Sequence, residues 1–111
     1  MKSIIDFLEL MKINNFQYNI ILSRNDDAFI ERMSDSDFKY FINNSVFVKD
    51  NFNSIVNLVS IKKLSCIGGE FYKIFNNKIE HTNDYWDKYF EISDYLKANP
   101  STDILIKFVI N

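Results

Sequence analysis

Apolar residues recur along this chain with two different periods, and each period predicts a different element. The first stretch places apolar residues at helical spacing: Ile4, Phe7, Leu8 and Met11. With Ser3 as its cap, it predicts a helix over residues 3–13. Residues 16–23 then alternate apolar with polar, which predicts a strand. Residues 28–33 fit either a returning strand or one helical turn.

The middle of the chain predicts short elements separated by polar clusters. The serine and aspartate cluster at residues 34–37 is typical of a helix cap, and one apolar stripe follows it. Residues 46–48 predict a brief strand. Residues 54–61 are rich in β-branched side chains, which favours a strand over a helix. Gly68-Gly69 is interpreted as a break, a turn or bulge that enters a strand over residues 70–75.

The last third of the chain predicts a hairpin, a long helix and a final strand. Asn76-Asn77-Lys78 predicts a turn into a short strand over residues 79–81. Thr82 begins the helix predicted to run to Ala98, and Asn99-Pro100 ends it, because the residue before proline avoids the helical region. Residues 104–110 are apolar on both faces, which predicts a central strand covered on both sides.

Helices at both ends with strands between them indicate an α+β fold. We expect a mostly antiparallel sheet of about four to six strands, with the N-terminal and C-terminal helices packed on it. The 111 residues, 47% of them hydrophobic, are enough for a single globular domain over residues 1–111 with one core.

Cysteine usage and hydropathy indicate the compartment. Cys66 is the only cysteine, so the sequence gives no sign of a disulfide framework. Asp6 and Glu9 interrupt the first apolar run, which argues against a signal peptide. No stretch approaches the ~20 apolar residues of a membrane span. We therefore expect a cytoplasmic protein without a membrane partner.

Candidate chemistry is sparse, and no metal or cofactor site is predicted. His81 is the only histidine, and Gly68-Gly69 lacks the lysine and serine or threonine of a phosphate-binding loop. The neighbours Glu80, His81 and Asp84 suit a shared proton or a divalent ion. A small enzyme with acid–base chemistry at His81 or a carboxylate is thus one alternative hypothesis. The other interpretation of these residues is a solvated turn.

Binding of single-stranded nucleic acid is a second alternative. Lys62-Lys63 is the only adjacent basic pair, and Phe71, Tyr72 and Phe75 follow it on a predicted strand. The net charge of −2 and the two arginines argue against this hypothesis, since nucleic-acid surfaces usually carry a concentrated basic patch.

Carboxylates and aromatic residues concentrate in two segments. The first segment carries four aspartates: Asp26, Asp27, Asp35 and Asp37. The predicted last helix carries acidic and aromatic residues together: Asp84, Tyr85, Trp86, Asp87, Glu91, Asp94 and Tyr95. These aromatics exceed one buried face, so we expect Tyr95 and Trp86 to be partly exposed. Exposed aromatic residues anchor protein interfaces, and carboxylates around them attract a basic partner. The alternative is a core helix with a solvated acidic face.

The chain as a whole resembles bacterial immunity proteins. It is small and cysteine-poor, its residue usage is typical of an AT-rich gene, and its predicted surfaces are acidic and aromatic. In these features it is similar to the partners of colicins and of contact-dependent growth-inhibition toxins. The resemblance implies a non-enzymatic protein that binds a basic nuclease toxin and blocks it. It assigns no role to individual residues, and the oligomeric state stays open.

Overall fold

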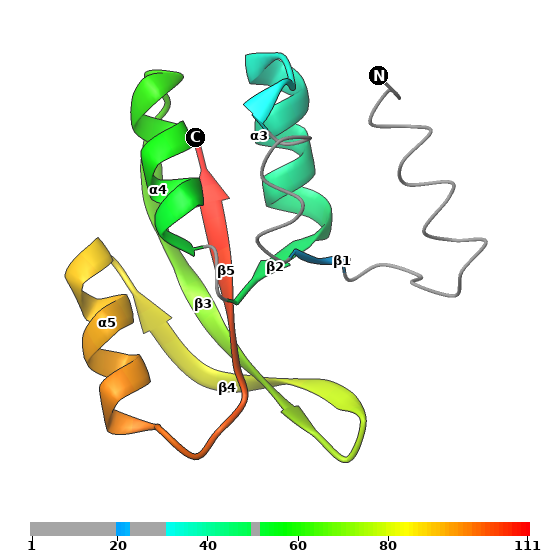
Figure 1. Ribbon diagram of the computed structural model, residues 1–111, viewed down its shortest axis with the longest axis vertical. Helices are drawn as coiled ribbons and strands as arrows, with labels where there is room; N and C mark the ends of the chain where they lie inside the picture. The colour runs from blue at the N-terminus through cyan, green and yellow to red at the C-terminus, as the bar shows by residue number, and fades with distance from the viewer. Residues whose placement is uncertain (1–19, 23–30, 50–51) are drawn as a thin grey trace.

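The computed structural model describes residues 20–22, 31–49 and 52–111, and these residues form an α+β fold (Figure 1). The elements follow in the order β1 (Ile20–Leu22), α3 (Asp35–Ser45), β2 (Val46–Val48), α4 (Phe52–Ile61), β3 (Cys66–Phe75), β4 (Lys78–Trp86), α5 (Tyr89–Ala98) and β5 (Ile104–Ile110). The helix predicted over residues 3–13 lies outside the described residues. So does most of residues 16–33, apart from β1, which confirms part of the predicted strand there.

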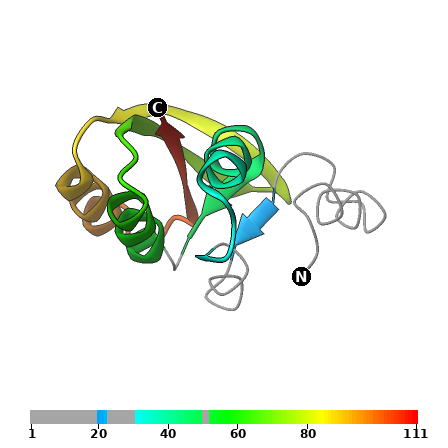
Figure 2. The same ribbon diagram turned by 90° about the horizontal axis from the view of Figure 1, so that it is seen from above.

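One sheet organises the described part of the chain, with strand order β1-β2-β5-β3-β4. The β1–β2 pair is parallel and the other pairs are antiparallel, as the fold class predicts. Helices α4 and α5 lie side by side on one face, and α3 lies beside the C-terminal end of β5 (Figures 1 and 2). Asn43 makes that last contact, because its side-chain amide exchanges two hydrogen bonds with the backbone of Ile110.

The predicted central strand is confirmed. Strand β5 is third in the sheet, and Leu105 and Ile106, which point to opposite faces, are both fully buried. Ile104, Ile106, Phe108 and Ile110 of β5 belong to one buried core with residues of α3, α4 and α5. The buried helix residues of this core are Phe38, Phe41, Ile42, Ile55, Leu58, Val59 and Ile92.

The structure confirms several predictions about where helices begin or end and where the chain turns. The Ser34 hydroxyl accepts a hydrogen bond from the Asp37 amide at 3.2 Å and caps α3. Asn76 and Asn77 adopt positive φ angles of 51° and 61°, which a two-residue hairpin turn requires. Helix α5 ends at Ala98, directly before Asn99-Pro100, as predicted.

The strand predicted over residues 54–61 is wrong, because these residues form α4. Ile55, Leu58 and Val59 follow helical spacing, and all three are buried in the core. Burial of one complete helix face outweighs the modest preference of β-branched residues for strands. Lys63, with a φ of 56°, turns the chain after the helix and lets the Leu64 amide donate to the Val59 carbonyl.

The break predicted at Gly68-Gly69 is also wrong, although the bulge that was its alternative is confirmed. Both glycines lie inside β3, where the register against β5 shifts between Cys66 and Gly68. A side chain on Gly69 would place its Cβ 2.6 Å from the Trp86 ring. The missing side chain is therefore what admits the indole between β3 and the core.

The helix predicted from Thr82 begins only at Tyr89, because β4 continues through Trp86. The hairpin pairing persists to the end of β4, where Trp86 lies opposite Gly69. Burial of the indole in that position, at 2% exposure, stabilises the strand over the helix. The acidic and aromatic residues predicted to share one helix are thus divided between β4 and α5.

Candidate partner-binding site

The connection between β4 and α5 brings together most of the predicted partner-binding residues. Asp84, Tyr85 and Trp86 lie at the end of the strand, and Asp87 lies in the connection. The residues of this set on α5 are Glu91, Asp94 and Tyr95. Asp84 and Tyr95 meet across this junction, where the tyrosine hydroxyl donates to Asp84 Oδ2 at 2.8 Å.

Tyr95 is held in place by packing as well as by Asp84. Its ring stacks on Phe71, with centroids 3.8 Å apart and planes within 5°. Burial raises the pKa of the Tyr95 hydroxyl, and the neighbouring Asp84 carboxylate raises it further. The Tyr95 side chain is half-buried.

The Glu91 side chain accepts hydrogen bonds from backbone amides at the start of its own helix. Its Oε1 accepts hydrogen bonds from the amides of Asp87 at 3.3 Å and Lys88 at 2.9 Å. These amides precede the first turn of α5, where backbone donors have no partner within the helix. Glu91 is therefore a capping residue in this structure, and Asp87 and Asp94 are the carboxylates that remain directed to solvent.

The expected exposure of Trp86 is wrong. Its ring meets Phe108 edge-on at 5.0 Å, and its Nε1 has no hydrogen-bond partner among the described residues. Its single large side chain fills the space left by Gly69, which sequence periodicity does not reveal.

Other aromatic side chains at this junction are exposed in its place. Tyr85 is 64% exposed and Phe90 is 67% exposed, whereas Tyr89 is 38% exposed. Phe90 is not among the residues that the sequence pattern selects, although its position four residues before Asp94 puts both on one side of α5. Within the described ranges, the ion pairs include none of Asp84, Asp87 and Asp94.

The first acidic segment does not join this junction. Asp35 and Asp37 lie in the first turn of α3, where Asp35 is 3.6 Å from the Lys62 ammonium. Figures 1 and 2 show α3 well separated from α5. Asp26 and Asp27 lie outside the described residues.

Lys62 is used inside the fold. Its Nζ donates to the Met33 carbonyl at 2.7 Å and lies 5.5 Å from the centre of the Phe38 ring. The Lys62 side chain is only 10% exposed. The first lysine of the predicted basic pair is therefore not directed to solvent. On β3, the Tyr72 hydroxyl donates to Glu70, and burial together with this bond raises the pKa of Tyr72 to about 12.

Both ring nitrogens of His81 face groups of the protein. Nδ1 accepts from the Asn83 amide at 2.7 Å, and Nε2 lies 3.7 Å from Glu70 Oε2. Glu70, rather than Glu80 or Asp84, is the carboxylate that faces the imidazole. The only lone pair of the neutral ring is therefore already engaged. Among the residues that the structure describes, no His, Cys, Asp and Glu side chains gather in a group that could hold a metal ion.

Lys107 is a half-buried cation that the sequence analysis did not select. Its ammonium donates to the Ile42 carbonyl in the last turn of α3, and Glu70 lies opposite it on β3. Burial lowers the pKa of Lys107 to about 8, against the opposing effect of Glu70. The sequence feature that indicates this residue is a single lysine within an otherwise apolar central strand.

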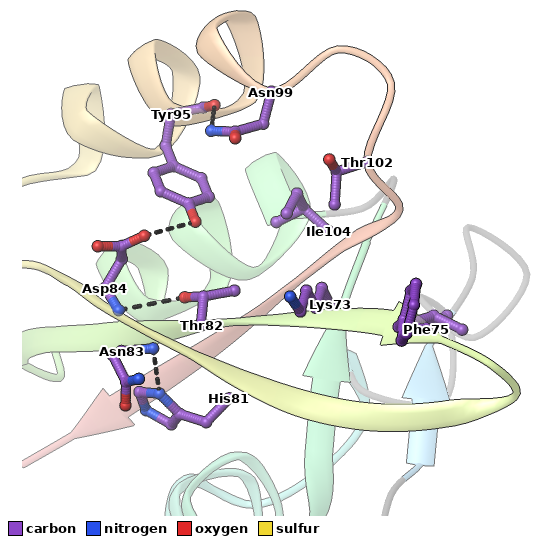
Figure 3. A pocket seen from close by; sticks show the side chains of 11 residues that line it. Lys73, Phe75, His81, Thr82, Asn83, Asp84, Tyr95, Asn99, Thr102 and Ile104 are labelled. Carbon is purple, nitrogen blue, oxygen red and sulfur yellow. Dashed lines mark hydrogen bonds between the residues drawn. The ribbon is translucent and has the colours of Figure 1, made fainter.

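A polar hollow of about 430 Å³ opens between β3, β4 and the loop that joins α5 to β5. Figure 3 shows Thr82, Asp84, Tyr95, Asn99 and Thr102 around it, with the His81 ring pointing away. Lys73 and Phe75 lie toward the hairpin end, where the ammonium is 5.8 Å from the centre of the Phe75 ring.

Comparison of the chain with protein-family models, curated proteins and solved structures finds no match. Within the described part of the chain, no helix has both the length and the apolar character that a membrane crossing requires.

Proposed function

We propose that this chain is a non-enzymatic immunity protein that binds a basic bacterial toxin of the nuclease type and blocks it. One observation carries the proposal. Tyr85 and Phe90, each about two-thirds exposed, lie at the two sides of a junction whose solvent-directed carboxylates, Asp87 and Asp94, have no cationic partner among the described residues.

The exposed aromatic rings supply a driving force for association. Complete burial of a phenylalanine side chain contributes about 1.5–3 kcal/mol. Because two-thirds of Phe90 is still exposed, an interface that covers it recovers the larger part of that contribution. Aromatic side chains of this kind dominate the affinity of protein interfaces.

The carboxylates supply selectivity for a basic partner. Asp87 and Asp94 lie at the surface, so their contribution falls mainly on the rate of encounter and weakens as salt increases. A nuclease toxin must carry basic residues to hold phosphates, and an acidic surface is complementary to such a site.

The geometry at His81 supports a binding role over catalysis. A general base needs a free lone pair directed at substrate, and the Nδ1 lone pair of His81 accepts the Asn83 amide instead. The imidazole thus stabilises the backbone of β4 at Asn83, which has a φ of 67°, by accepting its amide hydrogen.

The test begins with the gene next to the one that encodes this chain. Its product is purified and titrated with this protein by calorimetry at about 50 and 300 mM salt, and its nuclease activity is followed in parallel. The proposal expects saturable binding to a basic product, weakened by salt, and loss of nuclease activity at equimolar ratio.

Charge reversal locates the surface. The pair Asp87→Lys and Asp94→Lys is expected to weaken binding by about tenfold or more, since like charges are then brought together. The matched control is Glu31→Lys with Glu80→Lys, two exposed glutamates outside the junction that change the net charge equally. Equal weakening by both pairs would show a general charge effect, and no binding of any basic neighbour would refute the proposed function.

A further inference from the structure

The hollow beside the proposed interface has the size of a ligand site. Its volume of about 430 Å³ falls within the range that small-molecule sites and anchor pockets occupy. Its polar lining includes Thr82 and Asp84 of the strand β4, Tyr95 of the helix α5, and Asn99 and Thr102 of the loop (Figure 3).

The Asp84 carboxylate is fixed in orientation at one end of the hollow. The Asp84 amide donates to the Thr82 hydroxyl at 3.1 Å, and the Thr82 hydroxyl donates to the Phe71 carbonyl at 2.8 Å. Tyr95 donates to Asp84 Oδ2, so one carboxylate oxygen is occupied. The other, Oδ1, has no hydrogen-bond donor among the described residues.

Two further acceptors line the same hollow. Asn99 donates its Nδ2 to the Tyr95 carbonyl at 2.9 Å, which leaves its side-chain oxygen without a donor in the described ranges. Thr102 also lines the hollow, and its hydroxyl has no hydrogen-bond partner within the described part of the chain. The acceptor on Asp84 comes from β4 and those on Asn99 and Thr102 come from the loop after α5, so a ligand that satisfies them needs several donors held in one rigid group.

We propose that this hollow receives the guanidinium of an arginine side chain presented by the basic partner. The inference rests on the proposed function and names the anchor residue of that partner. A guanidinium carries five N–H donors in a planar fork and pairs with a carboxylate through two of them. A lysine ammonium is a compact point charge and matches acceptors spread over a strand and a loop less well.

Lys73 sets the direction in which the arginine enters. Its ammonium lies at the hairpin end, over the Phe75 ring, and disfavours a second cation there. The guanidinium therefore lies at the Asp84 end. Removal of the Lys73 charge should strengthen arginine binding.

The test uses a short probe, so it does not depend on finding the partner. Acetyl-Gly-Arg-Gly-amide is titrated into the ¹⁵N-labelled full chain to about 50 mM while amide chemical shifts are followed. We expect saturable shifts confined to residues 82–84, 95 and 99–104. The lysine and citrulline peptides serve as controls and should bind at least about tenfold more weakly, because citrulline lacks the charge and lysine lacks the fork.

Variants connect the shifts to the hollow. Asp84→Asn retains an oxygen for Tyr95 but removes the charge, and it should abolish saturation by the arginine peptide. Glu31→Gln is the matched control, an exposed carboxylate outside both the hollow and the junction that loses the same charge, and it should bind as the natural chain does. Lys73→Met should tighten binding about two- to fivefold.

Each alternative outcome has a defined meaning. The proposal is overturned if no saturable shift appears, if citrulline binds as well as arginine, or if Asp84→Asn has no effect. Saturation by a phosphate control centred on Lys73 instead would assign the hollow to an anion and overturn it too. If the arginine peptide fails while Asp87→Lys and Asp94→Lys still weaken binding of the whole partner, the proposed function stands without this pocket. If the peptide binds and no basic partner is found, the pocket stands without the proposed function.

Discussion

The half-buried ammonium of Lys107 makes the stability of this protein depend on pH in a predictable direction. The pKa of Lys107 is lowered from 10.5 to about 8 because burial penalises its charged form. Between these two values the unfolded chain holds the proton and the folded chain releases it. The unfolded state then binds more protons, so the free energy of unfolding rises as pH rises from 8 toward 10.5.

The magnitude follows from the same two values. Each unit of difference in pKa corresponds to 1.36 kcal/mol. Integrated over the part of the interval that experiments reach, Lys107 contributes a rise of about 2 kcal/mol between pH 7 and 9.5. Tyr72 and Tyr89, whose pKa values are raised to about 12 mainly by burial, act in the opposite direction, but only as the pH approaches 10. The interval below pH 9.5 therefore isolates the lysine.

The perturbation is Lys107→Met, which keeps the length of the side chain and removes its charge. Urea unfolding is followed at pH 7, 8, 9 and 9.5 through the fluorescence of Trp86, the single tryptophan of the chain. The natural chain should gain about 2 kcal/mol across the series, and the variant should show no such gain. Lys97→Met, at an exposed position on α5, is the control and should follow the natural chain. Parallel curves for Lys107→Met and the natural chain would refute the reasoning.

Three further predictions concern packing, capping and binding. Gly69→Ala should destabilise the fold by about 2–3 kcal/mol in urea unfolding, because its Cβ would meet both the Trp86 ring and the Lys107 carbonyl oxygen; an unchanged midpoint would show that β3 shifts freely. Glu91→Ala should lower the free energy of unfolding by about 1 kcal/mol, because the amides of Asp87 and Lys88 lose their acceptor. Glu91→Gln, which keeps an acceptor oxygen, should retain most of that free energy. Phe90→Ala should leave the thermal midpoint within about 2 °C of the natural value but weaken binding of the basic partner by about tenfold or more; a binding constant unchanged by this substitution would place the interface elsewhere.

Elements whose boundaries depend on a few adjacent residues could be predicted from the sequence. The Ser34 cap, the Asn76-Asn77 turn and the end of α5 before Pro100 each involve backbone groups within about one turn of the residue that determines them. The two-sided burial of β5 could also be predicted, because both faces of residues 104–110 are apolar.

Contacts between distant residues decided the rest. Residues 52–61 became a helix because Ile55, Leu58 and Val59 find a common core, a benefit that local propensity does not contain. The strand β4 continues to Trp86 because Gly69, seventeen positions earlier, leaves room for the indole.

The candidate site divides in the same way. The sequence by itself determined that carboxylates and aromatic residues gather over residues 84–95, since that is a matter of composition. Only the tertiary structure decided that Trp86 is buried, that Glu91 caps a helix and that Phe90 faces solvent. The physical reason is that exposure and hydrogen bonding depend on which surfaces meet, and the pairing of β3 with β4 and the packing of α5 fix those surfaces through contacts far apart in the chain.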